Sequence, residues 1–249
     1  MFPDWLQRLA SPPAFHRFAE RARPWLAGAA ALLLAAGFYG GLAIAPPDYQ
    51  QGEGFRILYV HVPAAWLSLF GYTVMAIAAV VALVWRVKLA ECVLLACAPV
   101  GASFTALALV TGMLWGKPMW GTYWTWDARL TSELVLLFLY LGVVALQQAL
   151  AEPRAAARAC ALLALVGSVN VPIVHYSVQW WNTLHQGPSV FRAGGPAIDA
   201  SMLWPLLCAA LGATVFSMAV VIQRAQNLLL LRERGNPWVR EALGLGGSA

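Results

Sequence analysis

Six long stretches without Asp, Glu, Lys or Arg constrain this chain more than any other feature of its sequence. They cover residues 24–47, 57–85, 92–116, 134–151, 159–191 and 200–223. A helix rises 1.5 Å per residue, so about 18–20 apolar residues cross the roughly 30 Å of hydrocarbon in a bilayer. Each stretch is long enough for one crossing. The sequence therefore predicts an all-α polytopic membrane protein, a bundle of six transmembrane helices.

The composition excludes several other classes of protein. Hydrophobic residues make up 61% of the 249 residues and charged residues 11%, whereas soluble domains carry about 25% charged residues. Too little chain remains outside the six stretches for a sizeable soluble catalytic domain. A transmembrane β-barrel would show alternating segments of about ten residues instead. We therefore expect one membrane domain over residues 1–249.

The basic residues predict the orientation of this domain. Twelve of the 16 fall on the side of the predicted bundle that carries both termini. These are Arg8, Arg17, Arg21, Arg23, Arg86, Lys88, Arg154, Arg158, Arg224, Arg232, Arg234 and Arg240. Because Lys and Arg are enriched in cytoplasmic loops, we expect both termini, with tails 1–23 and 224–249, in the cytoplasm. The loops 48–56, 115–133 and 178–199 then face outward.

The start of the chain and its missing motifs restrict function further. Ala43-Ile44-Ala45 resembles a signal-peptide cleavage site, but the apolar run is long and Pro46 follows, so we expect an uncleaved span. The four cysteines form no C-x-x-C or C-x-x-C-H, which argues against thiol-redox chemistry and covalent haem attachment. No P-loop motif is present, so the chain is not expected to hydrolyse ATP through one. The net charge of +5 reflects topology, and we expect no nucleic-acid partner.

The segment between the third and fourth predicted spans is rich in tryptophan. It reads WGKPMWGTYWTWDAR from Trp115 to Arg129. An aromatic belt at the membrane surface is the ordinary explanation, but the interspersed Gly and Pro favour a turned backbone that displays aromatic faces. Such a surface suits a flat, apolar, conjugated ligand. The candidate binding residues in this segment are Trp115, Trp120, Gly121, Tyr123, Trp124, Trp126, Asp127 and Arg129.

Three of the four histidines, His61, His175 and His185, are predicted on the outward side; His16 lies in the N-terminal tail. By helical rise His61 lies about 7 Å below the outer edge. A lone histidine near a helix end is more often a hydrogen-bonded interfacial residue than a ligand. Two neutral imidazoles beside an aromatic surface can, however, bind a haem iron from opposite axial directions. We predict His61 and His185 as these iron ligands and a structural role for His175.

Other residues of the outward side have competing interpretations. Zinc would require three or four ligands, usually with thiolate or carboxylate at close spacing, and no such spacing is seen. Asp127 and Glu133 are acid–base candidates, but a helix cap before Ala128 and a first-turn acid explain them equally. Haem carries two propionates. Lys117, Arg129 and Arg192 are the cations available to meet them, unless they merely reflect topology.

The segment from Trp120 to Asp127, W-G-x-x-W-x-W-D, resembles the signature of the WWD-domain haem-handling proteins of c-type cytochrome biogenesis. Length and layout narrow the resemblance to the haem exporter protein C family, CcmC, whose members span the bacterial inner membrane six times. It extends over nearly the whole chain, including residues 59–65, 128–133 and 175–187. Tyr123 stands where some relatives have Trp.

The resemblance implies a haem-delivery subunit of an ABC transporter complex rather than an enzyme. Family members hold haem b at the periplasmic face and deliver it to the haem chaperone CcmE. They work with the ATP-binding subunit CcmA, the membrane subunit CcmB and the small protein CcmD. The axial histidines of the family correspond to His61 and His185, and its tryptophan platform to Trp115 through Asp127.

Two other functions remain open from the sequence. The chain could be a non-haem permease subunit whose tryptophan loop anchors it at the membrane surface. It could also be a quinone-linked cytochrome b, although that class needs histidine pairs facing each other within the bilayer. An absorption spectrum of the purified chain distinguishes all three.

Overall fold

The computed structural model describes residues 11–187, 190 and 194–244, and the elements in this part of the chain are helical apart from an isolated bridge between Asp48 and Gly52. The longer helices are α2 (Pro12–Tyr39), α3 (Leu58–Trp85), α4 (Lys88–Trp120), α5 (Ala128–Ala149), α6 (Pro153–Gly167), α7 (Asn170–Trp180) and α8 (Ala200–Arg232). A π-helical turn, η1 (Gly40–Ile44), ends α2, a 3-10 turn, η2 (Glu53–Ile57), leads into α3, and the short α9 (Pro237–Ala242) follows α8.

Among the residues that the structure describes, six helical segments are long and apolar enough to cross a membrane, which confirms the predicted number of spans. They are Pro12–Ile44, Glu53–Trp85, Lys88–Trp120, Ala128–Ala149, Pro153–Trp180 and Ala200–Arg232. The fifth consists of α6 and α7, which are separated at Ser168 and Val169. Pro172 has no N–H to donate to the Ser168 carbonyl four residues earlier, and this explains the break.

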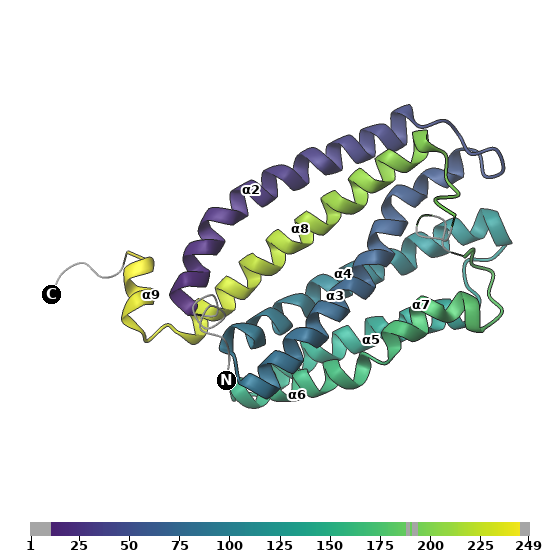
Figure 1. Cartoon of the computed structure of the whole chain (residues 1–249). Helices are drawn as coiled ribbons and strands as arrows, with labels where there is room; N and C mark the ends of the chain where they lie inside the picture. Colours follow the sequence, from purple (N-terminus) through teal and green to yellow (C-terminus); the bar gives the residue numbers. More distant parts are fainter. Residues whose placement is uncertain (1–10, 188–189, 191–193, 245–249) are drawn as a thin grey trace.

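The helices form three layers (Figure 1). α2 lies along α8, α3 packs on α4 in the middle, and α5, α6 and α7 form the third layer. One end of the bundle, at the right of Figure 1, contains the start of α3, the end of α4, the start of α5 and the end of α7. We call it the histidine end. The opposite end, where α2 begins and α8 leads into α9, is called the terminal end.

Close contact between helices depends on small residues. A Cβ added to Gly37 would lie 2.5 Å from the backbone nitrogen of Ala209, so α2 and α8 touch backbone to backbone. Gly101 of α4 likewise leaves room for the Tyr140 ring, whose hydroxyl donates to the Ser68 carbonyl at 2.8 Å. Small residues at helix interfaces are typical of membrane bundles. These contacts hold α2 against α8 and α5 against α3 and α4.

The structure corrects several predicted boundaries. The expected loop 115–133 is shorter, because α4 continues to Trp120 and α5 starts at Ala128. The helix continues through Pro118 until Gly121, at φ 78°, ends it in the left-handed region. Glu133 is not a first-turn acid: it lies deeper in α5 and is buried. Within the described residues, helix extends into both predicted tails, 1–23 and 224–249, because α2 begins at Pro12 and α8 continues to Arg232.

Candidate functional site

The last turns of α4 connect the two predicted iron ligands. His61 lies in the first turn of α3 and contacts Thr111 and Trp115 of α4. His185 follows α7 and contacts Trp120, the last residue of α4. The two imidazoles are within electrostatic range of each other. The fold thus brings two histidines that are far apart in sequence to the same end of one helix.

His61 is held on three sides. Its Nδ1 lies 3.0 Å from the Thr111 hydroxyl oxygen, and its ring meets the Trp115 ring edge-on with centroids 5.6 Å apart. A Cβ added to Gly112 would lie 3.1 Å from His61 Cε1, so glycine permits this close approach. The helix backbone and these neighbours leave the imidazole little freedom to rotate.

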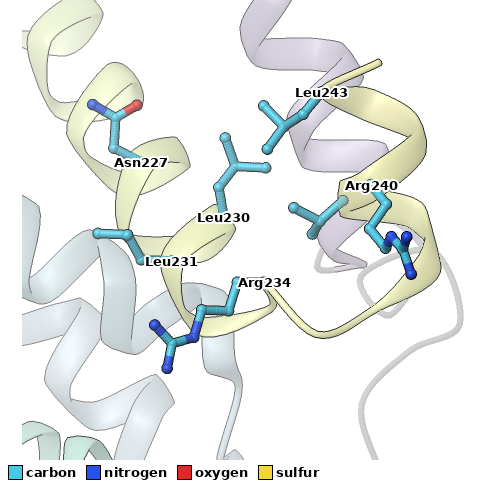
Figure 2. A pocket seen from close by; sticks show the side chains of 7 residues that line it. Asn227, Leu230, Leu231, Arg234, Arg240 and Leu243 are labelled. Atoms are coloured by element: carbon cyan, nitrogen blue, oxygen red, sulfur yellow. The ribbon is translucent and has the colours of Figure 1, made fainter. Parts of the chain in front are cut away.

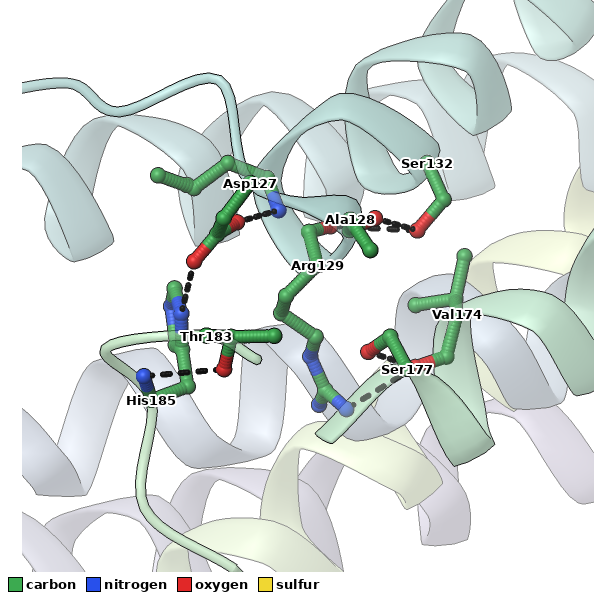
Figure 3. Close-up of polar contacts among 9 residues, drawn as sticks. Asp127, Ala128, Arg129, Ser132, Val174, Ser177, Thr183 and His185 are labelled. Atoms are coloured by element: carbon green, nitrogen blue, oxygen red, sulfur yellow. Dashed lines mark hydrogen bonds and ion pairs between the residues drawn. The ribbon is translucent and has the colours of Figure 1, made fainter. Parts of the chain in front are cut away.

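His185 is held by a carboxylate instead (Figure 3). Its Nδ1 lies 3.4 Å from Asp127 Oδ2, its backbone N–H donates to the Thr183 hydroxyl at 3.1 Å, and the Trp120 ring lies 4.8 Å away. The other Asp127 oxygen accepts from the Leu130 N–H at 2.8 Å. Asp127 therefore caps α5, as one of the two interpretations predicted, and also orients His185.

The protonation of His185 follows from its surroundings. Burial lowers the pKa of His185 below its ordinary value of 6.5; the Asp127 carboxylate opposes this shift and the Arg129 guanidinium adds to it. The imidazole is therefore neutral near pH 7. Because a carboxylate only accepts hydrogen bonds, the hydrogen of the neutral ring belongs on Nδ1, which leaves Nε2 with a free lone pair.

The loop between α4 and α5 presents aromatic rings to the outside. Trp126 is 77% exposed and Tyr123 53%, while Trp124 is half-buried and packs edge-on against Trp126 at 5.3 Å. The Thr122 hydroxyl donates to the Trp124 carbonyl at 3.0 Å, which fixes the turn. The loop therefore offers a partly fixed aromatic surface next to His185.

The predicted cations lie in different settings. Arg129 is half-buried and donates to the Val174 carbonyl at 3.0 Å (Figure 3). Lys117 is exposed, donates to the Gly121 carbonyl at 3.0 Å and lies 5.2 Å from the centre of the Tyr123 ring. Arg192 lies outside the described residues. His175 is exposed and packs edge-on against Tyr176.

Two residues of this site were not predicted from the sequence. Thr111 pairs with His61, and Gln51 accepts from the Trp115 indole N–H at 2.9 Å. Thr111 precedes Trp115 by one helical turn, so a shared face with Trp115 was deducible. Its pairing with a histidine of another span depends on how α3 packs on α4, which the sequence pattern does not state.

The site does not have the form of a multi-ligand metal centre. Within the described ranges, no three His, Cys, Asp or Glu side chains come together as a metal site would require. The cysteines are unpaired: Cys92, Cys97 and Cys160 are buried, and Cys208 is partly so. What the geometry offers instead is a pair of imidazoles beside aromatic rings, which suits a metal already held in a planar macrocycle.

A cavity of about 450 Å³ lies at the terminal end, between α8 and α9 (Figure 2). It is lined by Asn227, Leu230, Leu231, Arg234, Val239, Arg240 and Leu243. It lies at the opposite end of the bundle from the start of α3 and the end of α7 (Figure 1). This cavity is therefore not part of the candidate site.

Comparison with known proteins identifies the family of the chain. The profile of the family described as "Heme exporter protein C" matches residues 5–240. Heme exporter protein C of Escherichia coli (strain K12) is 50% identical over 238 residues, which cover 96% of each chain. That of Bradyrhizobium diazoefficiens is 52% identical over 224 residues, covering 90% of this chain and 85% of the relative. A putative cytochrome c biosynthesis ccmC-like mitochondrial protein of Marchantia polymorpha is 48% identical over 174 residues, covering 70% and 73%. The chain therefore belongs to the heme exporter protein C family.

Proposed function

We propose that this chain binds haem b as cargo between His61 and His185, at the periplasmic face of the bacterial inner membrane, and passes it to the chaperone CcmE. It acts in this proposal with CcmA, CcmB and CcmD in one transport complex. The single observation that carries the proposal is that both imidazoles lie at one end of α4 beside an exposed aromatic loop. The family to which the chain belongs supports haem as the cargo.

The chemistry of the site matches the parts of a haem. The apolar macrocycle would rest against the tryptophan rings, where burial contributes on the order of 25 cal/mol per Å² of apolar surface. The iron would take a nitrogen from each histidine. Arg129 and Lys117 are the cations among the described residues of the loop and the start of α5 that would meet the propionates.

Delivery of haem also requires that the chaperone can reach the bound haem. The described residues around His185, 181–187, form no helix, and the aromatic loop exposes Tyr123 and Trp126. A chaperone could therefore approach the outer edge of the macrocycle without disturbing the helix that carries His61. The chain would present haem there, while ATP hydrolysis belongs to a partner.

Haem titration of the purified chain tests the ligand assignment. We expect His61→Ala and His185→Ala each to weaken haem binding and shift its Soret band. His175→Ala is the matched control, because His175 lies on the same end but is exposed and contacts neither imidazole by any hydrogen bond or ring contact among the described residues. Unchanged spectra in both variants would remove the axial-ligand assignment, and a chain without any pigment would favour a non-haem permease subunit.

Loading of the chaperone tests the aromatic loop separately. Substitution of Trp120, Trp124 and Trp126 together by Ala should abolish haem transfer to CcmE while membrane insertion persists. Trp180 and Trp181, which are exposed at the end of α7, provide a matched control pair. Equal loss of transfer in both sets would show that any interfacial tryptophan serves, and would refute the role of the loop.

A further inference from the structure

We propose that Thr111 is a positioning residue: it holds His61 in the tautomer that carries hydrogen on Nδ1 and so directs a bare Nε2 toward the iron. This inference rests on the proposed function, because it assumes that His61 binds haem. It adds a residue from the middle of an apolar helix to a site otherwise built from histidines, tryptophans and charged groups.

The direction of the hydrogen bond between Thr111 and His61 determines the tautomer of the imidazole. The Thr111 hydroxyl lies 2.6 Å from the Leu107 carbonyl oxygen and 3.2 Å from that of Ala108, and both can only accept. A hydroxyl has one hydrogen to give. With that hydrogen committed to the helix backbone, the oxygen 3.0 Å from His61 Nδ1 must accept, so Nδ1 must be the donor.

The Thr111 oxygen therefore favours the neutral tautomer of His61 that carries its hydrogen on Nδ1. The opposite nitrogen, Nε2, is then unprotonated, and an unprotonated imidazole nitrogen is what iron requires.

The neighbours of His61 prevent the ring from escaping this arrangement. Gly112 and Trp115 confine it within van der Waals and ring contact, and Thr111 itself is buried with 8% exposure. A flip of the ring would replace Nδ1 by a carbon and leave the Thr111 oxygen facing a C–H group. The hydroxyl thus selects both the tautomer and the ring orientation.

Threonine hydroxyls in membrane helices commonly donate to the carbonyl four residues earlier, and this tendency alone would explain the bond from Thr111 to Leu107. Thr105 of the same helix does so, donating to the Gly101 carbonyl at 2.8 Å, and is fully buried. What distinguishes Thr111 is the use of its oxygen as an acceptor for a histidine. Thr105 therefore provides the matched control for the effect of losing a buried helix hydroxyl.

The first experiment reads the tautomer in the full chain without haem. Nitrogen NMR of ¹⁵N-histidine-labelled protein distinguishes the protonated from the bare ring nitrogen, and loss of signals in His61→Gln assigns them. We expect His61 protonated on Nδ1 in the unmodified chain, the same in Thr111→Ser and Thr105→Val, and a mixture of tautomers in Thr111→Val. Protonation on Nε2 in the unmodified chain, or an unchanged tautomer in Thr111→Val, would overturn the inference.

The second experiment measures hemin affinity and the spectrum of the bound haem for the same variants. Outer partners of metal-bound histidines typically change affinity by about 10–100-fold, so Thr111→Val should lose about tenfold while Thr111→Ser stays near the unmodified chain. A loss of the same size in Thr105→Val would mean that the effect is packing, which contradicts the inference. If the unmodified chain binds no hemin, the proposed function fails, whereas the tautomer experiment still decides the role of Thr111.

Discussion

The two histidines of the candidate site are held in opposite ways. His61 belongs to a helix of the bundle, and its Nδ1 faces a neutral hydroxyl. His185 belongs to the irregular segment after α7, and its Nδ1 faces a carboxylate. A carboxylate partner raises the basicity of a metal-bound imidazole more than a neutral acceptor does. We infer that the helix sets the position of the iron through His61 and that Asp127 strengthens the bond made by His185, which lies outside any helix.

Removal of either imidazole should have the largest effect and also separate the two roles. His61→Gly leaves a hole enclosed by Thr111, Gly112 and Trp115, in which free imidazole can rebind. We expect hemin affinity to fall by more than about 100-fold in His61→Gly and in His185→Gly, since even outer partners are worth about 10–100-fold. Added imidazole should restore the Soret band better in His61→Gly, as followed by optical titration. Equal rescue by imidazole in both variants would contradict the inference that His61 is held more rigidly than His185.

The next prediction concerns Asp127, which has two roles that different substitutions separate. Asn caps helices as well as Asp does, so Asp127→Asn keeps the cap of α5 but removes the charge beside His185. We expect hemin affinity to fall by about 10–100-fold with little change in Tm. Asp127→Ala should lose affinity similarly and also about 0.5–2 kcal/mol of stability from the lost cap.

The reduction potential of bound haem compares the two imidazoles most directly. A charged acceptor on His185 stabilises the ferric iron, so Asp127→Asn should raise the potential and Thr111→Val should change it less. Potentials from redox titration that shift equally in both variants would show that the two imidazoles are electronically alike. That outcome would contradict the inferred division of roles between His61 and His185.

A smaller effect is expected at Gly112. A methyl group there would approach His61 Cε1 to 3.1 Å and push the imidazole off its rotamer. Such a displacement costs about 0.5–1.5 kcal/mol, which corresponds to about 2–10-fold in affinity. Gly28→Ala is the control, because no atom lies within 4 Å of its added Cβ. Hemin titration in which both variants match the unmodified chain would mean that His61 is less confined than its contacts indicate.

The sequence predicted the bundle better than it predicted the support of the histidines. Charge-free stretches identify spans because the bilayer imposes a length on any apolar helix, and the six spans are confirmed. The approximate position of the tryptophan segment, between the third and fourth spans, followed from the same charge-free stretches. The pairing of Thr111 with His61 did not, because it depends on the relative height of α3 and α4 in the packed bundle. Local periodicity contains no such information.

Two boundaries differ from those predicted from the sequence. The predicted loop starts near the end of the charge-free stretch 92–116, whereas α4 continues as helix through Pro118. Glu133 was taken as an acid of the first helical turn, yet it lies a turn deeper and is 7% exposed, because α5 begins at Ala128. The distribution of charges locates a span, but it does not state at which residue the helix begins or ends.

The smallest predicted effect is the dependence of stability on pH without haem. Burial lowers the pKa of His185 in the folded chain below 6.5, the ordinary value of the unfolded chain. Between these two pKa values, His185 binds a proton in the unfolded chain but not in the folded chain. Stability therefore falls as pH drops through 6.5 and levels off below the pKa of the folded state. We expect Tm, measured from pH 8 to pH 5 in detergent, to decline less in His185→Gln than in the unmodified chain, and His175→Gln to behave like the unmodified chain. An identical decline in all three would show that the His185 segment is already solvated when no haem is bound, and the carboxylate would then act only after the cargo arrives.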